Sequence, residues 1–294
     1  MLTQAEIDLL PADAEVEHYR RHGWYLTRKL FSEDEIDSLV EASDRFYAGH
    51  RDRSLPKRPP NLAYWEPSHG PVQRHNDYVH YESEAISAIL RKPLVGAVAA
   101  RLAGVDEIRV FQATMIYKPP NAAELTNLVP WHADRHYWQT CTSDRMLTAF
   151  IPFHDCGEQM GTITMIDGSH LWQDIPGDDS TRHFAQRDRH ELDELLRKTA
   201  EFNGDQVTAI PMVIPKGHMS FHHCRIYHGS SHNRSTMPRR AISLHMQDGE
   251  NQWRPYHKAD GTRVVYNNDV LVRTTAAGNP DYADPEYCPV IWQR

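Results

Sequence analysis

Two short clusters of polar residues, far apart in the chain, carry side chains that together could bind a metal ion. The first is Trp-His-Ala-Asp at 131–134, and the second is His-Gly-Ser at 228–230, with Arg239 further on. Non-haem Fe(II) oxygenases hold iron on one face with two His and one carboxylate, which leaves the remaining positions open. His132, Asp134 and His228 would supply those ligands, so we expect an enzyme that activates dioxygen.

The spacing of the clusters fits this chemistry. Residues i and i+2 of a strand point to the same face, so His132 and Asp134 can reach one ion, with His228 coming from a distant strand. A bidentate 2-oxo acid would take two of the three open positions, and dioxygen would take the last. Arg239 can form a forked pair with the distal carboxylate of such a co-substrate. With 19 His in the chain, a chance His-x-Asp in a turn or network is the competing interpretation.

Two other functions are alternatives to this interpretation. A zinc hydrolase would hold a four-coordinate ion with an activated water, but this leaves Arg239 without a task, and no His-Glu-x-x-His occurs. A non-catalytic β-sandwich binding protein is the third hypothesis. The complete set of two His and one Asp argues against it.

Composition limits the class of protein. The 294 residues carry 40 acidic and 32 basic side chains, a net charge of −8, which disfavours nucleic acid or an anionic membrane as partner. No apolar run approaches the roughly 18 residues of a membrane span. The first residues lack a signal pattern, and the four Cys form no C-x-x-C pair. We therefore expect a cytoplasmic protein with reduced thiols.

The chain divides into three parts of one domain spanning 1–294. Helices are predicted at 12–22, from the Ser32/Glu35 capping box onward, and at 83–102, with a short strand at 24–26 and an irregular segment at 49–80. After this N-terminal helical part, about 1–105, strands are predicted at 108–117, 147–152, 162–166, 207–210 and 241–245. They indicate a mainly β core at about 106–250. A polar insert at about 172–206, helical over 189–202, is predicted to be lid-like, and 251–294 form a C-terminal extension.

Four motifs resemble the phytanoyl-CoA dioxygenase-like family of Fe(II)/2-oxoglutarate-dependent oxygenases. The resemblance covers roughly 15–250 and includes Tyr-Lys-Pro-Pro at 117–120, Gly-Thr-Ile-Thr-Met-Ile-Asp-Gly-Ser-His at 161–170, His-Gly-Ser-Ser-His-Asn-Arg-Ser at 228–235 and Pro-Arg-Arg-Ala-Ile-Ser-Leu at 238–244. It implies a double-stranded β-helix, a cupin-like jelly roll with flanking helices. It also implies Fe(II), 2-oxoglutarate and O2, with His132, Asp134 and His228 as the metal ligands.

The resemblance extends to residues around the metal. Arg239 matches the 2-oxoglutarate anchor, with Arg240 taking its place if the strand register differs by one residue. Ser230 would help to hold the same carboxylate, and two weaker cofactor-binding candidates, Gln112 and Thr148, could equally be structural strand residues. Lys118, His136 and Trp172 are candidate substrate contacts, against the alternatives of a solvated Lys, a hydrogen-bonded His and a core Trp.

The expected activity is hydroxylation of an unactivated C–H bond in a small molecule, with release of succinate and CO2. Desaturation, epimerisation or ring formation on a natural-product scaffold, with the same cofactors, remain alternatives. Related halogenases carry Gly or Ala in place of the acid of the triad. The presence of Asp134 therefore disfavours halogenation.

Overall fold

The structure, a computed structural model, describes residues 2–121, 128–176 and 189–294. Its α-helices are α1 (Gln4–Ile7), α2 (Asp13–His22), α3 (Glu33–Tyr47), α4 (Val79–Glu82), α5 (Glu84–Leu90), α6 (Pro93–Ala103), α7 (Arg189–Phe202) and α8 (Asn267–Leu271). Short 3-10 helices are η1 (Pro67–His69), η2 (Asp134–His136), η3 (Glu158–Met160) and η4 (Ser169–Leu171). The strands are β1 (Trp24–Leu26), β2 (Arg74–Asp77), β3 (Glu107–Lys118), β4 (Val129–His132), β5 (Leu147–Pro152), β6 (Ile163–Ile166), β7 (Ala209–Pro211), β8 (Ser220–His223), β9 (His228–Ser230), β10 (Arg239–Asp248) and β11 (Val290–Gln293).

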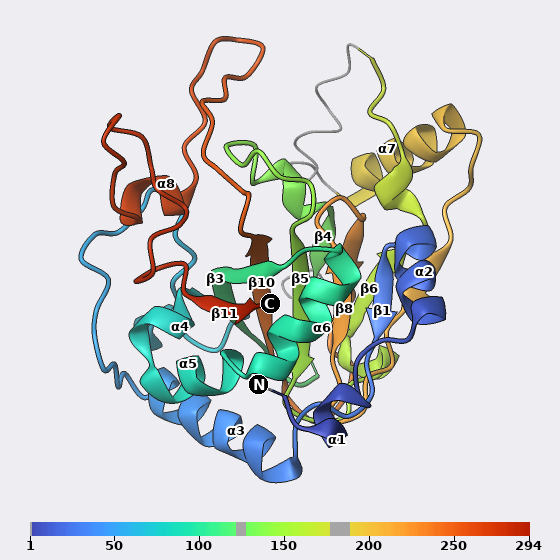
Figure 1. Cartoon of the computed structure of the whole chain (residues 1–294). Helices are drawn as coiled ribbons and strands as arrows, with labels where there is room; N and C mark the ends of the chain where they lie inside the picture. Colours follow the sequence, from blue (N-terminus) through green and yellow to red (C-terminus); the bar gives the residue numbers. More distant parts are fainter. Residues whose placement is uncertain (1, 122–127, 177–188) are drawn as a thin grey trace.

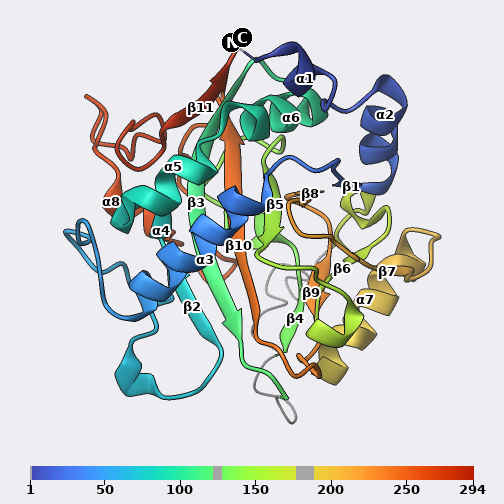
Figure 2. The same cartoon turned by 90° about the horizontal axis from the view of Figure 1, so that it is seen from below.

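Two antiparallel sheets form the core. The major sheet has the order β1-β8-β5-β10-β3-β11, and β2 also pairs with β3; the minor sheet has the order β4-β9-β6-β7. Figure 2 shows the long strands β3 and β10 side by side, with the minor sheet next to β5 and β8. This arrangement confirms the predicted jelly-roll core, in which two sheets enclose a central space.

The N-terminal helices cover the outer face of the major sheet. Apolar residues of α3, α5 and α6 pack in one buried cluster with outward-facing residues of β3, β5 and β10. The predicted capping box is present: Ser32 Oγ accepts from the Glu35 N–H at 3.1 Å, and the Ser32 N–H donates to the Glu35 carboxylate at 2.8 Å. The prediction of one helix over 83–102 was wrong. Pro93 begins a second helix, α6, because proline lacks the N–H that a continuing helix needs.

The segment predicted to be irregular, 49–80, contains a strand that matters for the site. β2 pairs antiparallel with β3, which places Asp77 opposite Thr114 and His75 opposite Ile116. Its sequence, Arg-His-Asn-Asp, has no apolar alternation, so the usual strand signal was absent.

The insert and the C-terminal extension lie on opposite sides of the core, as the positions of α7 and α8 show (Figure 1). Helix α7 has the bounds predicted from sequence and packs against β4, where Trp131 Nε1 donates to Asp193 Oδ1 at 2.8 Å. The remainder of the predicted lid, residues 177–188, falls outside the described residues. None of the helices in the described ranges has the length and apolar character to cross a membrane.

Candidate active site

A cavity of about 770 Å³ lies between the two sheets and brings the distant polar clusters together. His132, Asp134 and His228 all line it, with one potential ligand atom from each within 4.8 Å of the others. Asp134 Oδ1 lies 4.0 Å from His132 Nε2 and 3.7 Å from His228 Nε2. Two imidazole nitrogens and one carboxylate oxygen therefore converge on one point, as a metal ion requires.

Strand pairing explains how the two clusters meet. His132 ends β4 and is directly opposite His228 of β9. Asp134 does not continue the strand, contrary to the i, i+2 expectation, but begins the 3-10 turn η2. The end of the strand turns the carboxylate towards both imidazoles, so the chain reaches the predicted convergence by a different local geometry.

Backbone carbonyls fix which nitrogen of each imidazole faces the cavity. His132 Nδ1 donates to the Pro130 carbonyl at 2.8 Å, and His228 Nδ1 donates to the Ile226 carbonyl at 3.0 Å. Since Nδ1 carries the proton in both rings, Nε2 keeps its lone pair for a metal. Burial lowers the pKa of both imidazoles, which also favours the neutral, metal-binding form.

The second oxygen of Asp134 is held by neighbouring side chains. Thr148 Oγ1 donates to Asp134 Oδ2 at 2.6 Å and lies 2.8 Å from His245 Nδ1, from which it accepts, since a hydroxyl has only one proton. His222 Nε2 lies 3.3 Å from the same oxygen. Burial opposes ionisation, but the adjacent imidazoles of His228 and His222 outweigh it and hold the pKa of Asp134 well below its usual value. This arrangement leaves Oδ1 free to face a metal.

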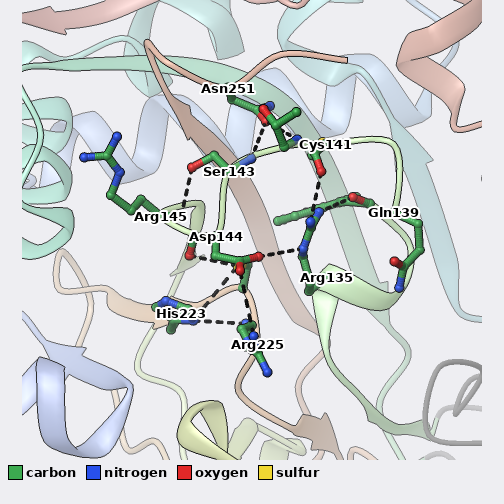
Figure 3. Close-up of polar contacts among 12 residues, drawn as sticks. Arg135, Gln139, Cys141, Ser143, Asp144, Arg145, His223, Arg225 and Asn251 are labelled. Atoms are coloured by element: carbon green, nitrogen blue, oxygen red, sulfur yellow. Dashed lines mark hydrogen bonds and ion pairs between the residues drawn. The ribbon is translucent and has the colours of Figure 1, made fainter. Parts of the chain in front are cut away.

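A second network anchors the turn that begins at Asp134. Figure 3 shows the Arg135 guanidinium reaching the Asp144 carboxylate, at 2.8 Å, and the Cys141 carbonyl, at 2.9 Å. The Arg135 N–H also donates to the Cys224 carbonyl at the end of β8, at 2.8 Å. Arg135 therefore ties the loop after the metal-binding turn to the major sheet.

The inner face of the major sheet presents its side chains in rows across the strands. Cross-strand register places His222, Thr148, His245 and Gln112 in one row, beneath Asp134. The next row contains Phe150, Ser243, Thr114 and Asp77, and the third contains Ala241, Ile116 and His75. Arg239 and Lys118 form the last pair. Because alternate strand residues share a face, these rows set the order of polar groups along the cavity.

The last row is a buried cationic end of the cavity. Arg239 is 1% exposed and donates to the Gly161 carbonyl at 2.9 Å, while its Nε has no hydrogen-bond partner. Lys118 Nζ donates to Ser230 Oγ at 2.7 Å and to the Ser231 carbonyl at 2.6 Å. Neither side chain has an acidic partner among the described residues, and Arg239 carries a charge at neutral pH. Buried charges of one sign require a counter-charge, so this end fits an anionic ligand.

The structure distinguishes the two candidate anchors. Arg239 lines the cavity, whereas Arg240 points away from it and pairs with Asp44 of α3 at 2.7 Å. Burial lowers the pKa of the Arg239 guanidinium to about 10, which leaves it charged at neutral pH. Burial, with Arg239 nearby, lowers the pKa of the Lys118 amine to about 5.

The remaining predicted residues have different positions. Gln112, Thr148, Ser230 and His136 line the cavity. Thr148 contacts Asp134, as described above, so it orients the carboxylate. Lys118 was a candidate substrate contact. It lies on the same face of β3 as Gln112, so its side chain is fully buried beside Arg239.

Trp172 differs from its predicted substrate-side position. Its ring packs in a buried cluster with α7 residues, and its Nε1 donates to Asp205 Oδ2 at 2.9 Å. It is a core residue that holds the insert against the minor sheet, and it does not line the cavity.

Sequence reasoning missed several cavity residues. They come from β2 and from the loop before α8: Gln73, His75, Asp77, Lys258, Arg263 and Tyr266. No motif or periodicity marks them, because the segments that carry them are short and irregular. His222 also lines the cavity, and its strand register opposite Thr148 places it there.

Comparisons with known proteins identify the family and the fold. The family model for phytanoyl-CoA dioxygenase (PhyH) matches residues 19–241. An ectoine dioxygenase of Bordetella bronchiseptica is 26% identical over 253 residues, covering 84% of this chain and 79% of that protein. The non-haem alpha-ketoglutarate-dependent carbocyclase SnoK from nogalamycin biosynthesis has a TM-score of 0.69 at 19% identity, covering 95% of this chain and 96% of SnoK. The epimerase SnoN, solved with Fe3+, alpha-ketoglutarate and nogalamycin RO, has a TM-score of 0.67 at 20% identity, covering 95% and 98%.

The site and the fold together define a metal-dependent oxygenase of the jelly-roll type. The chain belongs to the phytanoyl-CoA dioxygenase family. This confirms the predictions of a dioxygenase and of iron and 2-oxoglutarate as its cofactors, for which the cavity has a matching triad and a cationic end. The structural likenesses, all at low identity, identify the fold.

Proposed function

We propose that the protein hydroxylates an unactivated C–H bond of a small molecule, using Fe(II), 2-oxoglutarate and O2. The observation that carries the proposal is that one cavity contains both the His132–Asp134–His228 triad and the buried cation Arg239. When bound, the iron and 2-oxoglutarate supply oxidation by dioxygen: one oxygen atom enters succinate as CO2 is released, and the other enters the product. The chain itself supplies ligands, orientation and exclusion of water.

Each residue has a defined task in this proposal. His132 Nε2, His228 Nε2 and Asp134 Oδ1 hold the iron, and Thr148 keeps the other carboxylate oxygen turned away. Arg239 holds the distal carboxylate of 2-oxoglutarate through its unpartnered Nε and its fork of N–H groups. Ser230 accepts from Lys118, so its own proton is available to the same carboxylate.

The first experiment tests the site without a substrate. Apo-protein is titrated anaerobically with Fe(II) and 2-oxoglutarate, and the visible charge-transfer band of an iron-chelated 2-oxo acid is recorded. We expect the band in the wild-type protein, loss of the band in His228→Ala, and a normal band in Arg240→Ala, which removes a neighbouring guanidinium outside the cavity. A folded, metal-loaded protein that forms no band would exclude the proposal.

The second experiment tests the reaction. Ectoine, suggested by the relative, heads a panel of small molecules screened for stimulated succinate release under ¹⁸O₂. A hydroxylase gives a product that gains one labelled oxygen atom. A product that loses two hydrogens or keeps its mass would instead identify desaturation, ring formation or epimerisation, and would contradict the hydroxylase proposal.

A further inference from the structure

Beyond the triad, the cavity is bounded by a wall that carries a buried carboxyl group. Asp77 of β2 is 5% exposed and lines the cavity opposite Thr114 of β3. Thr114 Oγ1 donates to Asp77 Oδ1 at 2.7 Å, and the Ala63 N–H donates to Asp77 Oδ2 at 2.9 Å. The carboxyl group is thus held in a fixed position on a strand, inside the cavity where a substrate would lie.

The neighbouring hydrogen bonds all run towards this carboxyl group. Tyr266 OH donates to Gln112 Oε1, and Gln112 Nε2 donates to Thr114 Oγ1 at 3.1 Å, which in turn donates to Asp77. Every proton in the chain points towards Asp77, which favours its ionised form. A carboxylate has about four acceptor positions. The two hydrogen bonds from Thr114 and Ala63 leave acceptor positions for a ligand.

Other side chains add acceptors to the same wall. The carbonyl oxygens of Gln73 and Asn267 are buried and accept no hydrogen bond from the residues that the structure describes. Both residues line the cavity. A buried acceptor without a donor is costly, so the wall has a surplus of acceptors that a ligand rich in N–H groups would satisfy.

Asp77 forms no ion pair with a basic side chain in the described ranges, residues 2–121, 128–176 and 189–294. Burial, with Arg239 and Lys118 nearby, lowers the pKa of His75 in the next row to about 4, so this imidazole is neutral at neutral pH. Burial raises the pKa of Asp77 to about 6, which leaves it mainly ionised at pH 7.5. Lys258 lines the cavity from the C-terminal loop, and Arg263 beside it is exposed, where solvent and salt screen its charge.

We propose that the substrate is a small molecule with a protonated nitrogen group, an ammonium, amidinium or guanidinium, which binds the Asp77 carboxylate. This substrate class rests on the proposed oxygenase function, because it places the substrate beside the triad while 2-oxoglutarate occupies the Arg239 end. The cation supplies the missing counter-charge and donates to the acceptors of the wall, and the carboxylate selects it over neutral or anionic molecules of equal shape.

Three probes of nearly equal shape test the selection: benzamidinium, benzamide and benzoate. Their affinities are measured calorimetrically, under anaerobic conditions, with metal-loaded protein saturated with 2-oxoglutarate so that the Arg239 end is occupied. We expect benzamidinium to bind about tenfold tighter than benzamide, the difference between a charged and a neutral hydrogen-bonded pair. Benzoate should bind more weakly than both.

Variants locate the selection. Asp77→Asn preserves the size of the side chain and removes its charge, so the preference for benzamidinium should fall to within about threefold. Asp260→Asn, the same change at an exposed residue of the C-terminal loop, is the matched control and should retain the preference. A preference that survives in Asp77→Asn overturns the proposal.

The outcomes separate this proposal from the proposed function. If the wild-type protein binds the three probes equally, prefers benzoate, or binds none, the cationic substrate class is wrong even where the 2-oxoglutarate charge-transfer band is normal. If that band never forms, the oxygenase function itself fails. The probe order in the wild-type protein decides the question even if Asp77→Asn does not fold.

Discussion

The two ends of the cavity bury opposite charges that the protein leaves unbalanced. Arg239, with the Lys118 amine beside it, forms the cationic end, and neither side chain has an acidic partner in the described part of the chain. Asp77 lies two rows from Arg239, on the β2 side, and its wall is called the acceptor end. Each end is costly for the folded protein by itself, because a buried charge without a partner is strongly disfavoured. The comparison shows a cavity built to be completed by two ligands of different charge.

The same strands build both ends, which fixes their separation. Gln112, Thr114 and Lys118 share one face of β3, and His245 and Arg239 share one face of β10. The triad stands over the first row, so a dicarboxylate reaching from Arg239 to the metal leaves the β2 side for the substrate. Predictions about each end can therefore be tested independently of the other.

The largest effect is expected where both ligands meet, at the metal. Asp134→Ala removes the carboxylate of the triad, and turnover should fall by more than the roughly 10- to 100-fold typical of residues that only orient a ligand. Succinate release measures it. Asp144→Asn, an acid ten residues on that contacts Arg135 and no metal ligand, should retain most activity. Full activity in Asp134→Ala would exclude the triad.

Removing the Arg239 guanidinium should weaken the binding of 2-oxoglutarate and leave the binding of a cationic ligand nearly unchanged. Arg239→Ala should raise the KM for 2-oxoglutarate by roughly 10- to 150-fold, the range for a charged hydrogen bond. Benzamidinium affinity should stay within about twofold, since Asp77 lies rows away on another strand. Arg240→Ala is the control and should leave the KM unchanged. A similar rise in both variants would contradict the register that turns only Arg239 inward.

Ser230 and Arg239 could be proposed from sequence as co-substrate contacts because compact motifs carry them, whereas Lys118 was a candidate substrate contact. His228 and Ser230 are two residues apart on β9, and Arg239 begins the next long strand. The choice between Arg239 and Arg240 depended on a strand register that spacing alone does not fix. In the structure Arg239 lines the cavity and Arg240 pairs with Asp44 outside it.

The acceptor end could not be predicted because long-range pairing creates it. Asp77 lies on a four-residue polar strand, and Tyr266 lies in an irregular C-terminal segment far along the chain. Neither segment has a period or motif. Trp172 shows the reverse case. This aromatic residue near a motif was a candidate substrate contact, but it packs against α7 and is buried, as in the alternative of a core Trp.

A smaller effect is expected from Lys118, the amine beside Arg239. Lys118→Met keeps the volume and removes the donor to Ser230 Oγ, so the KM for 2-oxoglutarate should rise about tenfold. Because Lys118 acts through Ser230, the double variant Lys118→Met/Ser230→Ala should cost little more than either single variant. Steady-state kinetics of the four proteins measures the coupling, and fully additive losses would show that Lys118 acts independently.

The smallest effect concerns stability and comes from the acceptor end. Burial raises the pKa of Asp77 from 3.8 to about 6 in the folded protein. The folded state therefore binds a proton more tightly than the unfolded state, and the free energy of unfolding falls as pH rises from about 4 to about 6. The penalty reaches roughly 3 kcal/mol above that window.

Asp77→Asn cannot ionise, so it should lack this penalty. Relative to the wild-type protein, its free energy of unfolding should improve by roughly 2 kcal/mol between pH 4.5 and pH 7.5. What the amide loses by facing the Ala63 N–H is the same at both pH values. Urea denaturation of both proteins at the two pH values measures this difference in the free energy of unfolding. The other titrating groups are the same in both proteins, so their contributions cancel. A pH-independent difference would mean that Asp77 is charged and paired at both values, and that the acceptor end needs no cation from outside.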